Sequence, residues 1–359
     1  MTVICADAID TLLEPVTFAG MPLANRFVMA PMTRLRSPGG VPTDEVAAYY
    51  RRRAGVGLIV TEGVLVGHPS AGHETTVPRM TAAAGSGWRR VVDEVHAAGG
   101  RIAAQLWHLG SLREPVDGVE AWTPSGVREP GRPANHAMTL ADIDTLLEAY
   151  ADAARVAGRA GFDAVEVHAA HGYLLDEYLW PLTNRRTDAF GGSPRGRAAF
   201  PAAVVRAVRS QFPADRPVIV RFSQFKERAF DARIAAGPDE LGQILGAFAD
   251  AGASALHASQ RRFWEPAFDG SALNLAGWAR RLTGLPAITV GSVGLTREFL
   301  HPAGPGSIAG LADRITAGEF DLAALGRILL ANPDWVAHAA AGRLDAITGY
   351  EKRHEDIYP

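Results

Sequence analysis

Two histidines and a tyrosine stand close together in Val165–Tyr173, which reads Val-Glu-Val-His-Ala-Ala-His-Gly-Tyr. The apolar, strand-like start of this segment ends at His168, so the polar side chains begin where a parallel strand would pass into its following loop. The N–H groups of His168 and His171 can both point at one ligand oxygen, and Tyr173 adds a weak phenolic acid. Such a trio is suited to polarising a carbonyl group and delivering a proton.

The same spacing has other interpretations. His-x-x-His is half of a zinc site, or a pair of structural loop histidines, and Tyr173 could be a packing aromatic. A zinc site needs further ligands, but Glu166 is expected to point away from His168 by strand alternation. Glu62 or His257 could converge on the pair. We favour oxygen binding and predict that no metal is bound.

Polar residues also follow the other apolar runs of the chain. If these runs are barrel strands, their carboxyl ends hold the active site. The residues at these ends include Thr33, Arg34, Glu62, Gly63, Gln105, Trp107, His108, Arg221 and His257. The hydroxyl of Thr33, the carboxamide of Gln105 and the cation of Arg221 suit a flat heterocycle with alternating donors and acceptors, such as a flavin. Arg221 would stabilise its anionic reduced ring electrostatically.

Glycine-containing segments follow the last two apolar runs. Barrel enzymes commonly bind phosphate with the loops after strands seven and eight, which here are Gly291–Gly294 and Gly326-Arg327. Glycine lets backbone N–H groups approach phosphate oxygens, and the guanidinium adds a charged donor. We therefore predict that these loops bind the phosphate of a cofactor or substrate. Asn332-Pro333 is predicted as the N-cap and first-turn proline of a helix.

Eight short apolar runs alternate with longer amphipathic stretches, a pattern typical of βα units. The runs are Phe27–Ala30, Leu58–Thr61, Ile102–Gln105, Ala164–Val167, Val218–Val220, Ala255–His257, Ile288–Val290 and Leu322–Leu325. Leu140–Ala160 is predicted as a helix capped by Thr139, because its apolar residues recur at spacings of three and four. Eight such units favour a TIM (β/α)8 barrel over an open doubly wound sheet.

We therefore expect an α/β protein with one domain over residues 1–359, in which the barrel covers about 24–342. An N-terminal extension (1–23) and a C-terminal tail (343–359) flank the barrel, and the tail is either disordered or a cap. Two loops, Ser111–Ala137 and His301–Ser307, do not fit the βα repeat. Long loops on the carboxyl-end rim are usually pocket walls.

The composition is that of a globular protein that acts on small molecules. Of 359 residues, 47% are hydrophobic and 21% charged, and the net charge of −3 gives no nucleic-acid or anionic-membrane footprint. Cys5 is the only cysteine, which excludes intrachain disulfides, iron–sulfur clusters and thiolate zinc sites within one chain. Neither an export signal nor a membrane-spanning run is recognised, so we expect a cytoplasmic location.

Several motifs together resemble the old yellow enzyme family of FMN-dependent ene-reductases on a TIM barrel. They run in the family's order from about Leu23 to Trp335, nearly the whole chain. The motifs are Leu23–Arg34, Gln105–His108, His168–Leu175, Asn184–Ser193 and Leu325–Asp334.

The resemblance implies roles for individual residues. It implies FMN as bound cofactor, held by Ala30, Pro31, Met32, Thr33, Gly63, Gln105 and Arg221, with Gly291, Ser292, Val293, Gly326 and Arg327 at its phosphate. His168 and His171 match the pair that binds the substrate carbonyl oxygen, and Tyr173 matches the proton donor. Trp107 corresponds to a pocket-wall aromatic, and Trp264 is predicted to contact substrate.

The expected function is NAD(P)H-dependent reduction of the activated C=C bond of an α,β-unsaturated carbonyl compound, with NADPH or NADH as hydride donor. One alternative is a flavin-dependent desaturase or dehydrogenase on the same barrel, and another is a non-redox lyase that binds a phosphorylated substrate. Self-association into a homo-oligomer is an expectation from the family alone. The motifs give no role to Asp176.

Overall fold

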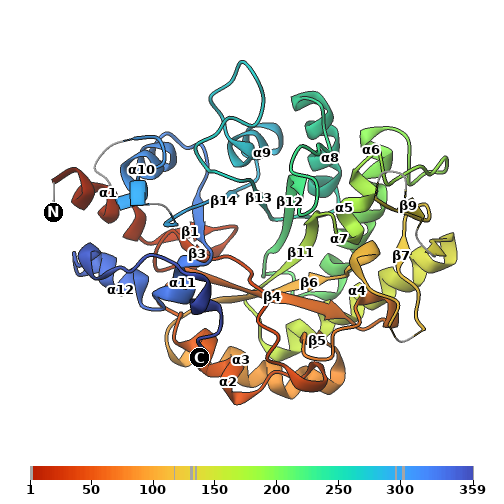
Figure 1. The fold of residues 1–359 in the computed structure, drawn as a ribbon, viewed down its shortest axis with the longest axis horizontal. Helices are drawn as coiled ribbons and strands as arrows, with labels where there is room; N and C mark the ends of the chain where they lie inside the picture. The colour runs from red at the N-terminus through yellow and green to blue at the C-terminus, as the bar shows by residue number, and fades with distance from the viewer. Residues whose placement is uncertain are drawn as a thin grey trace.

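The computed structural model describes residues 3–116, 118–129, 132–133, 136–295, 297–300 and 304–358. Within these residues, eight parallel strands form a closed barrel with helices around it (Figure 1). Each barrel strand pairs with the next one along the chain, and the last pairs with the first. The fold is therefore the predicted TIM barrel, whereas its assignment as one domain stays a prediction.

All eight barrel strands lie where the sequence predicted them. They are β3 (Phe27–Met29), β4 (Leu58–Val66), β6 (Ile102–Trp107), β11 (Ala164–His171), β12 (Val218–Lys226), β13 (Ala255–Ser259), β14 (Ala287–Val290) and β15 (Leu322–Leu325). Five of them, β4, β6, β11, β12 and β13, extend further at the carboxyl end than predicted. In β4, β11, β12 and β13 the extension contains polar residues, so a search for apolar runs ends before it, whereas in β6 Gln105 interrupts the run before Leu106 and Trp107.

Alternate residues of the strands fill the barrel, as expected for side chains that point to opposite faces. The apolar layer contains Val28, Leu58, Val60, Ala103, Ala164, Ile219, Ala255, Ile288, Leu322 and Ala324. The hairpin of β1 (Val16–Phe18) and β2 (Met21–Leu23) packs against this layer through Phe18, Met21 and Leu23. The amino-terminal end of the barrel is thus closed by apolar side chains, which leaves the carboxyl end for a site.

Amphipathic helices cover the outside of the strands. They are α2 (Asp44–Arg51), α3 (Gly85–Ala97), α4 (Leu140–Ala160), α7 (Ala199–Gln211), α8 (Pro238–Asp250), α9 (Leu275–Thr283) and α10 (Ile308–Thr316). The bounds and cap of α4 are as predicted, since the Thr139 side chain accepts a hydrogen bond from the Asp142 N–H at 3.2 Å. The remaining α-helices of the described residues are α1 (Val3–Leu13), α5 (Leu174–Leu179), α6 (Pro194–Arg197), α11 (Ile328–Ala331) and α12 (Trp335–Ala340).

The prediction that Asn332 caps a helix is wrong. Asn332 follows the end of α11, and α12 begins only after Asp334. The Asn332 side chain instead accepts the Thr348 N–H at 2.9 Å and donates to the Thr348 carbonyl at 2.8 Å. These two hydrogen bonds pair with the Thr348 backbone. The Asn332 side chain therefore holds the C-terminal tail and does not cap a helix.

The C-terminal tail folds back onto the barrel. Tyr358 stacks on Tyr49 of α2 with 4.7 Å between ring centroids, and the Arg34 guanidinium lies over both rings. In Figure 1 the C-terminus accordingly lies close to α2. Of the two open expectations for the tail, the structure supports a cap.

Short strands form in the Ser111–Ala137 loop, at the margin of the molecule opposite α1 (Figure 1). They are β7 (Trp122–Thr123), β8 (Val127–Glu129), β9 (Arg132–Pro133) and β10 (His136–Ala137). In the other long loop, positions 301–303 are outside the described residues, and Ser307 caps α10. Among the helices that the structure describes, none is long and apolar enough to cross a membrane.

Candidate active site

The predicted catalytic residues meet at the carboxyl end of β11. The ring centroids of His168 and His171 are 5.3 Å apart, and those of His168 and Tyr173 are 5.0 Å apart. Trp107 of β6 makes an edge contact with Tyr173 at 4.9 Å. All four side chains line one cavity of about 190 Å³ together with Pro31, Thr33, Gly63, Gln105, Arg221 and Glu227. The structure thus brings predicted residues from the ends of five strands, β3, β4, β6, β11 and β12, together at one barrel mouth.

The two histidines are held differently. His171 lies in left-handed backbone, with a φ of 68°, and its Nε2 is 2.8 Å from the Ser259 hydroxyl. The His168 Nδ1 is buried and makes no hydrogen bond within the described part of the chain. Burial, and then the nearby Arg221 cation, lower the pKa of both imidazoles well below 6.5. Both rings are therefore neutral at pH 7, and each carries one N–H donor.

The Tyr173 hydroxyl lies at the outer side of the cavity. It donates a hydrogen bond to the Glu227 carboxylate at 3.2 Å. Burial raises the pKa of Tyr173 above its ordinary value, and Glu227 raises it further. The phenol consequently stays protonated at any physiological pH, which a proton donor requires.

A polar layer lies directly beneath His168 inside the barrel. Glu166 accepts hydrogen bonds from Gln105 at 2.8 Å and pairs with His257 at 2.6 Å. Burial alone would raise the pKa of Glu166, but His257 and Arg221 outweigh it and lower the pKa. The fixed negative charge of Glu166 balances the buried Arg221 cation, whose Nε has no hydrogen-bond partner among the described residues.

The expected orientation of Glu166 is wrong. Residues two apart on a strand share a face, so Glu166 and His168 both point into the barrel, and the intervening Val167 points outward. Even so, the described residues contain no group of three side chains placed to hold a metal ion. Glu166 pairs with the Nδ1 of His257 instead.

A second cavity of about 310 Å³ adjoins the first, since Pro31 and Arg221 line both. The predicted phosphate-binding segments after β14 and β15 meet here. The predicted residues that line this cavity are Ala30, Pro31, Met32, Arg221, Gly291, Ser292, Val293, Gly326 and Arg327. Pairing of β14 with β15, and of β15 with β3, places these loops side by side.

The two cavities fit a flat cofactor with a phosphate-bearing tail. A Cβ at Gly63 would lie 2.5 Å from the Trp107 ring, and one at Gly291 would lie 2.6 Å from the Gln260 carbonyl oxygen. Glycine is therefore required at both positions for the walls to approach each other. The unpartnered Nε of Arg221 between the cavities is a donor that a bound heterocycle would satisfy. The residues present thus fit FMN.

One predicted residue lies elsewhere. Trp264 lines neither cavity and packs against Phe263 and Gly306. Phe225 of β12 lies nearer the site, with its ring 5.3 Å from His171. The sequence did not identify three residues near the site, which are Phe225, Glu227 and Ser259. Of these, only Ser259 could have been found from its position, because it follows shortly after a predicted strand.

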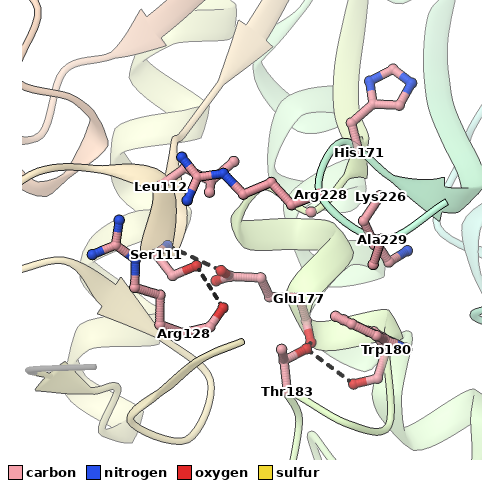
Figure 2. A pocket seen from close by; sticks show the side chains of 11 residues that line it. Ser111, Leu112, Arg128, His171, Glu177, Trp180, Thr183, Lys226, Arg228 and Ala229 are labelled. Carbon is pink, nitrogen blue, oxygen red and sulfur yellow. Dashed lines mark hydrogen bonds between the residues drawn. The ribbon is translucent and has the colours of Figure 1, made fainter. Parts of the chain in front are cut away.

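A third pocket, of about 130 Å³, is lined in part by His171 and Gly172. Figure 2 shows the His171 ring directed away from two other residues of this pocket, Glu177 and Trp180. Lys226 of β12 lines the pocket and forms a fully buried ion pair with Asp176 of α5 at 2.6 Å. Asp176 also accepts the Gly172 N–H at 2.6 Å. This ion pair gives Asp176 a role, because it anchors the turn that carries His171.

Burial raises the pKa of Asp176 to about 6, while Lys226 opposes this rise. Burial lowers the pKa of Lys226, and Asp176 opposes that change. Both groups are therefore charged at neutral pH, as their short contact requires. The Glu227 N–H adds a bond to the His171 carbonyl at 3.2 Å, so α5 and β12 both hold the turn.

Comparison with known proteins identifies the family. The family model described as "NADH:flavin oxidoreductase / NADH oxidase family" matches residues 11–346. A probable flavin mononucleotide-dependent alkene reductase of Leishmania infantum is 33% identical over 357 residues, which cover 93% of this chain and 92% of that protein. The 12-oxophytodienoate reductase 7 of Oryza sativa subsp. japonica is 34% identical over 352 residues, with 90% and 86% covered.

Solved structures agree. Morphinone reductase in complex with tetrahydroNAD superposes with a TM-score of 0.81 at 31% identity, covering 96% of this chain and 93% of that chain. An old yellow enzyme homologue from Zymomonas mobilis gives 0.79 at 26% identity, covering 97% and 99%. The chain therefore belongs to the NADH:flavin oxidoreductase / NADH oxidase family, the old yellow enzyme family that its motifs predicted, and is an FMN-dependent oxidoreductase that uses NAD(P)H.

Proposed function

We propose that this enzyme reduces the activated C=C bond of α,β-unsaturated carbonyl compounds at the barrel mouth, with His168, His171 and Tyr173 as its catalytic residues. The observation that carries this proposal is the single cavity shared by the three side chains, which adjoins the cavity of the two glycine loops. Family membership favours a redox reaction over the non-redox lyase considered from the sequence.

The cofactor site would be built from the two adjoining cavities. Thr33, Gln105 and Arg221 would face the ring, and Arg327 with the backbone of Gly291–Val293 would hold the phosphate. A bound FMN would supply the redox chemistry of this site, the transfer of hydride from NAD(P)H to the β-carbon of the substrate. Arg221, held in place next to Glu166, would stabilise negative charge on the reduced ring.

His168 and His171 would hold the substrate carbonyl oxygen. Because both imidazoles are neutral, each offers one N–H, and negative charge that develops on the oxygen during reduction is stabilised by preorganised donors. Ser259 orients His171 through its 2.8 Å contact. Arg221 would add positive potential in a site from which substrate and side chains exclude water.

Tyr173 would protonate the α-carbon. Its ring packs between Trp107 and His168, which leaves the hydroxyl as the movable part. The hydroxyl would exchange its Glu227 contact for the substrate carbon, and solvent would then restore the proton. Trp107 would form a wall of the substrate site, whereas the role predicted for Trp264 has no support from its position.

An anaerobic enone screen tests this proposal. Purified protein should be yellow, should be reduced by NADPH or NADH, and should be reoxidised by cyclic enones or maleimides with formation of the saturated ketone or imide. A colourless protein that cannot be loaded with FMN, or a reduced protein that no activated alkene reoxidises, would contradict it.

We also propose that the enzyme works in the cytoplasm on small molecules, without nucleic acid or a membrane. The net charge of −3 and the single cysteine support this setting. Assembly into a homo-oligomer stays a proposal that rests on the family alone, and gel filtration with light scattering would decide it.

A further inference from the structure

An exposed aromatic ring that packs against an arginine lies on the rim beside the active site. Phe230, in the loop after β12, is 55% exposed, and the Arg261 guanidinium lies 4.1 Å from its ring centroid. Arg233 belongs to the same loop as Phe230. The three side chains line a pocket of about 110 Å³. An aromatic face with adjacent guanidinium groups is suited to binding a planar base and a phosphate.

This pocket adjoins the sites already described. Arg261 lines it and also lines the cavity of the glycine loops. Ser259, which contacts His171, lines it as well. The Phe225 ring lies 5.3 Å from His171 and 6.2 Å from Phe230, so aromatic rings lead from the catalytic histidine to the rim. A ligand that reacts at the barrel mouth can therefore extend to Phe230.

The charges around the pocket leave the two arginines for a ligand. Arg262 pairs with Glu265 at 2.8 Å, which engages that acid. Among the ion pairs of the described residues, none involves Arg233 or Arg261, and the Arg233 guanidinium donates only to backbone carbonyls of its own loop. Two exposed cations without a carboxylate partner would attract a dianion more strongly than a neutral hydroxyl.

We propose that Phe230, Arg233 and Arg261 bind the adenosine 2′-phosphate end of NADPH, so that this enzyme prefers NADPH to NADH. The adenine stacks on Phe230, and the two guanidinium groups hold the 2′-phosphate, for which planar bidentate donors are well matched. The proposal rests on the proposed function, since it requires NAD(P)H to deliver hydride at the barrel mouth.

Direct binding gives the first test. The oxidised holoenzyme is titrated by calorimetry with 2′,5′-ADP and with 5′-AMP, which lacks the 2′-phosphate. We expect 2′,5′-ADP to bind about a hundredfold more tightly than 5′-AMP, and Arg233→Gln or Arg261→Gln each to lower the affinity for 2′,5′-ADP about tenfold, because a charge-assisted hydrogen bond contributes about this much. Arg281→Gln on α9 is the control, because Arg281 is exposed and lies outside the pocket, so the affinity should be unchanged.

Flavin reduction gives the second test. In anaerobic stopped flow, wild type should have a larger kcat/KM for NADPH than for NADH. In the Arg233→Gln/Arg261→Gln variant, kcat/KM for NADPH should fall to the value for NADH, which should itself stay unchanged. Phe230→Ala should raise KM for both coenzymes equally, because both carry adenine.

Equal use of both coenzymes by wild type, or an unchanged NADPH advantage in the double variant, would overturn this inference while leaving ene-reduction intact. Failure of the proposed function would look different, since the reduced enzyme would then not be reoxidised by any enone. If the variants change KM only for a carboxylate-bearing enone, the pocket binds substrate and the coenzyme assignment is wrong.

Discussion

At the scale of single residues, burial decides the charge of the side chains that would contact substrate. His168 and His171 lie in a site where desolvation and the Arg221 cation both disfavour the imidazolium form. In a neutral pair each ring donates one hydrogen bond, and neither ring changes its protonation state near pH 7. The carbonyl-binding role therefore depends on placement rather than on titration.

The neutral state of the pair can be observed directly. Because the pKa of each ring lies well below 6.5, neither ring takes up a proton between pH 8 and pH 6. We expect the imidazole ¹⁵N shifts of histidine-labelled enzyme to show both rings neutral throughout this range. A titration midpoint near 6.5 for either His168 or His171 would disprove the assigned charge state.

Removal of the Tyr173 hydroxyl tests proton donation. Tyr173→Phe keeps the ring contacts with Trp107 and His168 but has no proton to give, so the reduced enzyme should reduce an enone about 10²–10⁴-fold more slowly. Reduction of the flavin by NADPH should be nearly unchanged. Stopped-flow measurement of the two half-reactions separates these effects, and equal slowing of both would instead indicate a general disturbance of the site.

At the scale of elements, α5 and β12 position the turn between them. The strained φ of His171 costs about 1 kcal/mol or more, and the Asp176–Lys226 ion pair with the bond from Gly172 to Asp176 opposes relaxation. Both elements line the third pocket, where Figure 2 shows Glu177 of α5 and Lys226 of β12. The geometry of the catalytic histidine is thus a property of two packed elements.

Breaking the ion pair should affect stability and ligand binding together. Lys226→Met leaves the Asp176 charge buried without a partner, so we expect a loss of about 3–5 kcal/mol in the free energy of unfolding and weaker binding of phenols, which mimic the enolate. Asp176→Leu/Lys226→Met should recover most of the stability without restoring phenol affinity. Arg314→Met, which breaks a partly exposed pair with Glu319 elsewhere, is the control. Wild-type phenol affinity in the double variant would contradict a positioning role.

At the scale of the whole molecule, barrel closure brings the distant segments together. The pairing of β15 with β3 joins the two ends of the barrel and places Arg327 beside the Pro31–Thr33 segment. The C-terminal tail then packs on α2 and on Arg34, which follows that segment. Glu62 is buried beneath this junction, and one of its oxygens accepts the N–H groups of Arg34 at 2.8 Å and Leu35 at 3.4 Å.

Glu62 should make global stability depend on pH. Burial raises its pKa from 4.5 to about 7, and the two backbone bonds and Arg34 only partly oppose this. The folded state therefore holds the proton more tightly than the unfolded state, so this stabilisation is complete below pH 4.5 and is lost as pH rises to about 7. The loss is at most about 3.5 kcal/mol, from about 1.4 kcal/mol for each pKa unit between 4.5 and about 7.

Chemical denaturation of wild type and Glu62→Gln between pH 4.5 and pH 8 measures this effect. The variant cannot titrate at this position, so the difference in unfolding free energy should change with pH in favour of the variant as pH rises. All other ionisable groups are common to both proteins and cancel in the difference. A difference that is constant across this range would show that Glu62 titrates normally.

The sequence by itself determined the eight barrel strands, α4 with its Thr139 cap, and most of the residues that line the two adjoining cavities. These features are local, because apolar runs, helical spacing and capping chemistry are read within a few residues. Because the carboxyl ends of all strands in a TIM barrel lie on one rim, residues found locally at these ends can be predicted to form one site. The motifs also identified the family correctly.

Only the tertiary structure decided how those residues are oriented and supported. Asp176 and Lys226 are 50 positions apart, His171 and Ser259 are 88 apart, and Glu166 and His257 are 91 apart. Such pairs depend on strand register and on buried charges that must find partners, and no local pattern encodes either one. For the same reason the position of Trp264, the tail contact of Asn332 and the approach of Arg261 to Phe230 became apparent only once the barrel had closed.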